Sequence, residues 1–340
     1  MNLNWQHFLS KHHAQFNSET DISFPSATVD SSKALYPIAH LGILSISGTD
    51  AAKLLQGQIT CNVNDITETK SSLGALCNPK GRVLSTFLLI KTPSAFLMIL
   101  PIDLLDSIQK RLRMYILRSV VTIDNATETL CLFGLKDQTH SNSNERFFTD
   151  QTSYIRVNFS STLNRQLIIA DPDTATQLWT EYTTQESFTP SHSADWQYLD
   201  LLEGIPWLSL ATAEEFIPQM LNLDELGGIS YTKGCYTGQE IVARTHYLGK
   251  SKRELVLAEC QSPQTPAPNS SIYALDSDSD QGIAKVVLAI PAPNLATDQN
   301  KPDLIKQTLL IVLQVQENAP IQLIIKTEPL TPVTLLTQQP

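Results

Sequence analysis

The order of apolar and polar positions along the first half of the chain predicts strands that alternate with helices. Residues 43–57 read as a strand followed by a short helix. Ser47 or Thr49 is placed to cap the start of that helix, and Gly57 is placed to end it. This region is therefore expected to begin a mixed α and β domain.

Two apolar runs, 83–91 and 95–100, are separated only by a Thr-Pro-Ser turn, which predicts a β-hairpin. Pro101 then opens a segment whose apolar residues recur at helical spacing, with cations at the positions between them. The residues that define this apolar stripe are Leu104, Leu105, Ile108 and Leu112.

Farther along, residues 136–152 are polar and predict a loop or linker, and 154–187 read as a second group of strands and a helix. A further helix is expected after Asp195. Beyond Arg253 short apolar runs alternate with Pro- and Ser-rich connections, a pattern typical of a small β-barrel or sandwich. These runs are 255–259, 283–290, 308–314 and 321–326.

Composition narrows the classes of protein that the chain could belong to. With 340 residues, 42% of them hydrophobic and 17% charged, it has enough apolar material for two or three folded domains. The formal net charge of −10 argues against nucleic-acid binding over the whole surface. We expect no secretory signal and no membrane-spanning helix. The five cysteines are odd in number, and a chain of this length needs no disulfides to fold, which favours a reducing compartment, the cytoplasm. They contain no Cys-x-x-Cys pair, so a metal site is not expected.

The most motif-like segment is 217–249, which contains Gly227-Gly228 and Gly234-Cys235. Lys233 and Arg244 are close to Cys235 in sequence, and cations beside a sulfur favour the reactive thiolate. The alternative is a tight turn that carries an ordinary buried cysteine. A phosphate-binding loop is disfavoured because the Walker spacing is missing.

The octapeptide KGCYTGQE at 233–240 resembles the signature of the YgfZ family, folate-binding proteins related to the T-protein of the glycine cleavage system. The flanking sequences, IPQ from Ile217, LGGIS from Leu226 and VAR from Val242, also match the family pattern. Upstream, the resemblance extends to Gly48–Asp50, Leu55–Thr60, Pro79–Val83 and Leu112–Val121, so that it covers roughly 43–253.

The resemblance implies an α+β fold of T-protein type, with three domains in a ring and a small C-terminal β-barrel. The expected domains are 1–135, 136–252, which carries the octapeptide, and 253–340. An interleaved arrangement of the first two is left open as an alternative. The implied function is to bind tetrahydrofolate or a derivative and to support iron–sulfur enzymes, including those that modify tRNA. The implied partners are folate and iron–sulfur proteins, and we expect a monomer that neither enters a membrane nor binds nucleic acid directly.

By resemblance, Cys235 and Lys233 are the functional pair of the motif, and a second set of residues is expected to bind the cofactor. That set consists of Trp196, Tyr236, Gly238, Gln239, Glu240, Arg244 and Glu203. Trp196 matches a tryptophan that contacts folate in a bacterial relative, although it could equally be a core aromatic. The second folate tryptophan of that relative falls at Leu41 here, which removes one stacking partner.

Glu203 is the weakest member of this set. The pterin-contacting carboxylate of related aminomethyltransferases aligns with Leu202, so that Glu203 is offset by about 100° on a helix and reads as an exposed helix-end acid. The essential aspartate of those enzymes has no counterpart in 81–86. Aminomethyltransferase activity is therefore not expected, whereas other one-carbon transfer or demethylation stays open as an alternative.

Charge is unevenly distributed around the motif. Between 233 and 253 five cations face a single acid, Glu240, which gives that stretch a net charge of +4. This allows a further alternative, an RNA- or protein-binding adaptor, as well as the simpler interpretation of a solvated basic face. The five cations are Lys233, Arg244, Lys250, Lys252 and Arg253.

Overall fold

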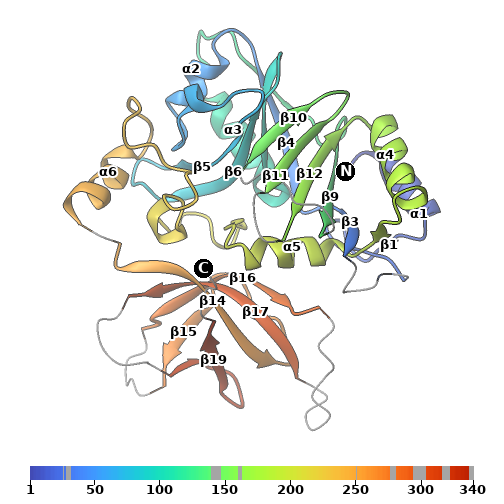
Figure 1. Ribbon diagram of the computed structural model, residues 1–340. Coiled ribbons are helices and arrows are strands. Elements are labelled where there is room, and N and C mark those ends of the chain that lie inside the picture. The colour runs from blue at the N-terminus through green and yellow to red at the C-terminus, as the bar shows by residue number, and fades with distance from the viewer. Residues whose placement is uncertain are drawn as a thin grey trace. The chain divides into compact units, whose positions relative to one another are not determined.

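A computed structural model shows how the chain folds (Figure 1). The structure describes residues 1–25, 27, 32–138, 147–159, 163–249, 251–275, 281–293, 304–315 and 322–336. Lys250, one of the cations of the basic stretch, lies outside these residues. None of the described helices is long and apolar enough to cross a membrane.

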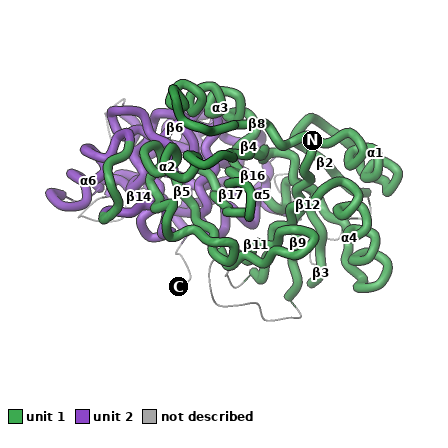
Figure 2. Tube along the Cα trace, turned by 90° about the horizontal axis from the view of Figure 1, so that it is seen from above, with its two compact units in different colours: residues 1–74, 87–196, 232–236 green, residues 75–86, 197–231, 237–340 purple. Residues whose placement is uncertain are grey.

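The chain divides into two compact units, and each takes three separate stretches of sequence (Figure 2). Unit 1 contains residues 1–74, 87–196 and 232–236, and unit 2 contains 75–86, 197–231 and 237–340. These two units divide the chain in a different way from the three domains expected at 1–135, 136–252 and 253–340. The expected domain bounds stay a prediction.

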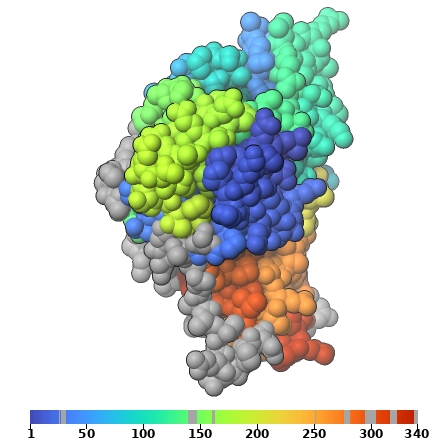
Figure 3. Space-filling model, turned by 90° about the vertical axis from the view of Figure 1, so that its right-hand side faces the viewer, coloured from blue at the N-terminus to red at the C-terminus, as the bar shows by residue number. Residues whose placement is uncertain are grey.

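Unit 1 contains a six-stranded sheet in the order β10-β11-β12-β9-β3-β13, in which only the β3–β13 pair is parallel. One face of this sheet is covered by α1 (Leu3–Lys11) and α4 (Pro172–Thr184), whose Trp5 and Trp179 meet edge to face beside Phe133. The surface of the N-terminal segment adjoins that of α4 in Figure 3. The strands are β3 (Lys33–Pro37), β9 (Cys131–Asp137), β10 (Phe148–Gln151), β11 (Ile155–Phe159), β12 (Arg165–Ala170) and β13 (Thr189–Pro190).

A five-stranded sheet follows the order β5-β6-β7-β4-β8. The predicted hairpin is confirmed, since β6 and β7 pair from Leu88–Ile99 to Lys91–Phe96. The helices near this sheet are α2 (Ala51–Gln56), the 3₁₀ turn 102–104 and α3 (Leu105–Arg113). Its strands are β4 (Leu41–Ser47), β5 (Ser72–Cys77), β6 (Val83–Lys91), β7 (Ala95–Pro101) and β8 (Thr122–Asn125).

Two local predictions in unit 1 need correction. The N-cap of α2 is Asp50 rather than Ser47 or Thr49, and its carboxylate accepts a hydrogen bond from the Val120 backbone N–H at 2.8 Å. The predicted linker at 136–152 ends in a strand, β10, because Thr149 is fully buried and its segment pairs with β11. The smaller elements of the unit are β1 (Gln15–Phe16), β2 (Ile22–Ser23) and the 3₁₀ turn 63–65.

Unit 2 ends in a closed barrel in the order β14-β17-β16-β15-β18-β19, which confirms the β character expected of the C-terminal residues. Ala258 and Cys260 from β14 and Leu309 and Ile311 from β17 alternate into its core, as the two-residue period of a strand requires. The strands are β14 (Arg253–Ser262), β15 (Ser271–Ala274), β16 (Ala284–Pro291), β17 (Ile305–Gln314), β18 (Leu323–Ile325) and β19 (Thr331–Leu335).

Two helices carry four of the nine predicted site residues, with Trp196 on the first and Gln239, Glu240 and Arg244 on the second. The expected helix around Asp195 is α5 (Ser193–Leu202), of which residues 193–196 belong to unit 1 and the rest to unit 2. The second helix, α6 (Gln239–Leu248), lies in unit 2 and directly follows the glycine of the octapeptide. Unit 2 also contains the 3₁₀ turn 218–221.

Candidate functional site

The octapeptide is shared between the two units. Residues 233–236 pack within unit 1, and residues 237–240 pack within unit 2. The two halves are therefore held in place by different sets of neighbouring residues.

Lys233 anchors the first half. Its Nζ donates hydrogen bonds of 2.8 Å to the backbone carbonyls of Ile59 and Cys61, and it lies 5.0 Å from the centre of the Tyr236 ring. Both carbonyl residues are buried, at 0% and 2% exposure, and a buried acceptor requires a donor. Lys233 thus joins the octapeptide to the 55–60 segment, two stretches that the family resemblance had singled out separately.

Burial changes the chemistry of this lysine. Its side chain is largely enclosed, and the loss of hydration lowers the pKa of Lys233 to about 8. A neutral amine still has two N–H groups, so both carbonyl contacts survive deprotonation. Whether Lys233 also activates Cys235, as expected from sequence, stays a prediction, because the ammonium is directed at the Ile59 and Cys61 carbonyls.

Cys235 is the exposed cysteine of this chain. All five cysteines are free, and the other four are buried. Burial raises the pKa of the Cys61 thiol to about 12 and that of Cys260 to about 11, so these thiols are poor nucleophiles at neutral pH. Accessibility therefore selects Cys235 as the thiol able to meet a ligand or a partner.

Gly238 positions the second half. Its φ of +85° lies in the left-handed region, and a Cβ built there would be 2.6 Å from the Asn78 carbonyl oxygen. A Cβ on Gly81, which has φ of +70°, would be 2.8 Å from Ile241 Cβ. Two glycines therefore let the 78–82 turn contact the start of α6, which joins two further segments of the family pattern.

The start of α6 presents polar groups. Gln239 is its first residue, and the exposed Glu240 lies in its first turn, where the helix dipole stabilises a carboxylate. Arg244 is also exposed on this helix. Of the cofactor-binding set, Glu240 and Arg244 are the members whose side chains face solvent.

The flanking motifs brace α6 and the barrel. Gln219 Nε2 donates 2.7 Å to the Val242 carbonyl and 3.3 Å to the Tyr231 hydroxyl. Asn222 bonds both the N–H and the carbonyl of Leu255, at 3.1 and 3.0 Å, at the start of the barrel. Gln219 and Asn222, which flank the octapeptide in sequence, therefore have a structural role.

Trp196 is 1% exposed and lies on the face of the six-stranded sheet opposite α1 and α4. A Cβ on Gly134 would overlap its ring, and the Arg165 guanidinium lies 4.6 Å from the ring centre. Phe159 meets the ring edge-on. Between the two interpretations of Trp196, this environment supports the core aromatic, and contact with folate stays a prediction.

Glu203 differs from its expected exposure. It is half-buried, with one carboxylate oxygen removed from solvent, and it is not the exposed helix-end acid that its spacing indicated. The helix α5, which ends one residue before Glu203, carries an acid that was not predicted as a site residue. Asp200 is fully buried and accepts a 2.8 Å hydrogen bond from Trp207 Nε1. An acid inside the apolar stretch LDLLEG was the available signal, since buried acids need partners.

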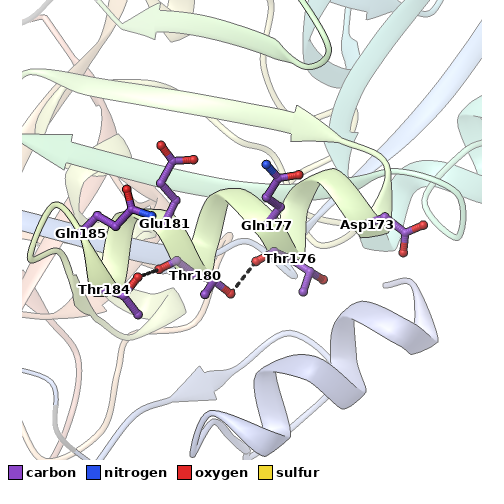
Figure 4. A pocket seen from close by; sticks show the side chains of 7 residues that line it. All are labelled: Asp173, Thr176, Gln177, Thr180, Glu181, Thr184 and Gln185. Carbon is purple, nitrogen blue, oxygen red and sulfur yellow. Dashed lines mark hydrogen bonds between the residues drawn. The ribbon is translucent and has the colours of Figure 1, made fainter.

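A surface recess of about 400 Å³ lies along α4 (Figure 4). The residues that line it all have polar side chains, and Thr176, Thr180 and Thr184 donate their hydroxyls to carbonyls one turn earlier in the helix. Its lining contains none of the predicted site residues. Among the described residues, no group of three or more His, Cys, Asp or Glu side chains is placed to hold a metal ion.

Comparison with solved structures defines the class of fold. The chain aligns over 99% of its length, and 97% of the other chain, with the crystal structure of glycine cleavage system aminomethyltransferase T from Bartonella henselae, at a TM-score of 0.73 and 12% identity. The predicted T-protein-type α+β fold is therefore confirmed, and at this identity the likeness concerns the fold alone.

Sequence comparison then gives the family. No family model matches the chain. It is 37% identical over 240 residues to the tRNA-modifying protein YgfZ of Colwellia psychrerythraea, covering 68% of this chain and 72% of that protein. It is 34% identical over 257 residues to the protein of the same name from Hamiltonella defensa, covering 73% and 76%. The chain belongs to the YgfZ family.

Proposed function

We propose that this protein binds a reduced folate and supports tRNA modification by helping to maintain iron–sulfur enzymes in the cytoplasm. The relatives named tRNA-modifying protein YgfZ support the link to tRNA, and the T-protein-type fold supports folate as the ligand. One observation carries the proposal. Lys233 and Gly238 hold the octapeptide against the Ile59 carbonyl and the 78–82 turn, while Cys235 between them stays exposed.

The residues present fit a folate in part. Glu203 supplies a half-buried carboxylate, and a carboxylate accepts charge-assisted hydrogen bonds from N–H donors such as those of a pterin ring. Arg244 supplies an exposed cation for the glutamate tail. Trp196 has its ring enclosed by Arg165, Phe159 and Gly134, so we assign it to the support of α5. When bound, tetrahydrofolate would supply a carrier for one-carbon units.

In this proposal the Cys235 thiol contacts the partner protein rather than the folate. A single thiolate does not hold an iron–sulfur cluster, which usually takes four cysteines, so any cluster contact would be shared with another protein or a small thiol. The segment 81–86 contains no carboxylate, so nothing there favours transfer of an aminomethyl group.

Folate binding is tested by calorimetric titration of the purified protein with tetrahydrofolate and its one-carbon derivatives. We expect saturable binding that Glu203→Gln weakens by about tenfold, the loss expected for one charge-assisted hydrogen bond. Cys235→Ala should bind as the wild type does. Absence of heat with every reduced folate would refute this part of the proposal.

The role of Cys235 is tested in cells that lack the endogenous protein, by measuring iron–sulfur-dependent tRNA modification. Cys235→Ala should lose complementation while keeping its unfolding curve, because the exposed thiol contributes little to the core. Thr232→Ala, an exposed neighbour outside the octapeptide, is the matched control. Full complementation by Cys235→Ala would remove the thiol from the function.

A further inference from the structure

Tyr231 and the end of α6 form a cluster of aromatic rings that the proposed function does not use. Tyr231 stacks on His246 with ring centres 3.6 Å apart and planes 13° from parallel. Tyr247 meets both rings edge-on, with centres at 6.3 and 4.8 Å. All three residues belong to unit 2, and α6 is labelled in Figure 1.

The cluster is fixed on its inner side and open on its outer side. The Tyr231 hydroxyl accepts a hydrogen bond from Gln219, which also binds the backbone of α6. His246 is exposed, and Tyr247 is 65% exposed. Pre-ordered rings with a free face lose little freedom when another flat ring stacks on them.

Cations lie close to this cluster in the sequence. Arg244 is one turn before Tyr247 on α6, and the exposed Lys252 and half-buried Arg253 follow the helix. Burial raises the pKa of Tyr231, and the charge of Asp224 adds to that rise. These cations supply charge for the phosphates of a ligand whose base stacks on the rings.

We infer that the ring cluster Tyr231–His246–Tyr247 is a contact site for single-stranded RNA. A base that is not paired stacks on Tyr247 and meets His246 edge-on, and the neighbouring phosphates lie toward Arg244 and Lys252. Stacking suits any base because every base has a flat π face, and the cations track the backbone. The choice of RNA over DNA rests on the proposed function, whereas the stacking geometry does not.

A local site of this kind is compatible with the net charge of −10. The acidic surface as a whole repels a polyanion, so binding should depend on a few contacts and should be weak and salt-dependent. This differs from the sequence-based expectation of no direct nucleic-acid contact, because the aromatic cluster becomes visible only when Tyr231 is placed against a helix fifteen residues further along the chain.

The test is fluorescence anisotropy with a labelled oligo(A) RNA of about 12 nucleotides, a length within the range of single-strand binding sites. At about 50 mM salt, where phosphate contacts contribute most, we expect Tyr247→Ala to weaken binding by about 5- to 150-fold. Tyr247→Phe should keep wild-type affinity, because the ring stacks and the hydroxyl does not. Leu248→Ala is the matched control, since Leu248 is the neighbouring residue and is 81% exposed.

Four results would overturn the inference: no binding by the wild type, unchanged binding by Tyr247→Ala, an equal loss in Leu248→Ala, or equal affinity for the oligo(A)–oligo(U) duplex. Equal affinity for oligo(dA) would overturn the choice of RNA. Tetrahydrofolate titration of Tyr247→Ala should match that of the wild type, so failure of the RNA contact can be told apart from failure of the folate proposal.

Discussion

Substitution of Gly238 tests how closely the octapeptide packs against the 78–82 turn, because the loss of stability depends on that contact. In Gly238→Ala the new Cβ meets a left-handed backbone, which costs about 1–2 kcal/mol. It also lies 2.6 Å from the Asn78 carbonyl oxygen, so packed backbone must shift, at a further cost of about 1–3 kcal/mol. We therefore expect the free energy of unfolding to fall by about 2–5 kcal/mol.

Two neighbouring glycines separate the causes. Gly227 has φ of +73°, and a Cβ added there would have no neighbour within 4 Å, so Gly227→Ala should lose only the backbone contribution of about 1–2 kcal/mol. Gly234 has neither a left-handed backbone nor a near neighbour, so Gly234→Ala should change stability by less than about 0.5 kcal/mol. Urea unfolding followed by circular dichroism measures all three variants.

The order Gly238→Ala, then Gly227→Ala, then Gly234→Ala is the expected ranking of destabilisation. If Gly238→Ala is no less stable than Gly227→Ala, the close approach of α6 to the 78–82 turn is wrong. Because Gly234→Ala should fold normally, any functional defect of that variant would report directly on access to Cys235.

Three further predictions concern single side chains. Iodoacetamide should label one thiol of the native protein, and peptide mass spectrometry should place it at Cys235, whereas labelling of several cysteines would contradict their burial. The stability of the wild type relative to Lys233→Met should increase as pH rises from about 8 to 10, because burial lowers the folded pKa of Lys233 to about 8 and the unfolded chain then binds the extra proton. Urea curves at several pH values test this, and a pH-independent difference would contradict it. Asp200→Ala should cost about 1–3 kcal/mol, because it leaves the buried Trp207 Nε1–H without its acceptor, and tryptophan fluorescence during urea unfolding would detect the loss.

The sequence predicted the elements well where the signal is local. The β6–β7 hairpin follows from two apolar runs around a turn, and α3 follows from the spacing of its leucines, since both patterns depend on near neighbours. The N-cap of α2 was misplaced because Asp50 is held by Val120, seventy residues away, and no local pattern records that contact.

The position of the candidate site in the sequence was predictable, but the contacts and burial of its side chains were not. The motif identified Lys233 and Cys235, yet the direction of the lysine depends on the carbonyls of Ile59 and Cys61, which lie far away in sequence. The burial of Trp196 depends in the same way on the missing side chain of Gly134. Side-chain direction and burial are set by long-range packing, which one sequence does not reveal.

The division of the octapeptide between Tyr236 and Thr237 limits how the molecule can be dissected. Each unit is assembled from three stretches, so no single cut yields either one intact, and no expressed fragment of one unit contains the whole motif. The strands of the barrel, in contrast, all come from one continuous stretch, 253–335. Truncated variants should therefore remove the barrel as a whole. Chimaeras between relatives should exchange the barrel as a whole and take residues 1–249 from one parent.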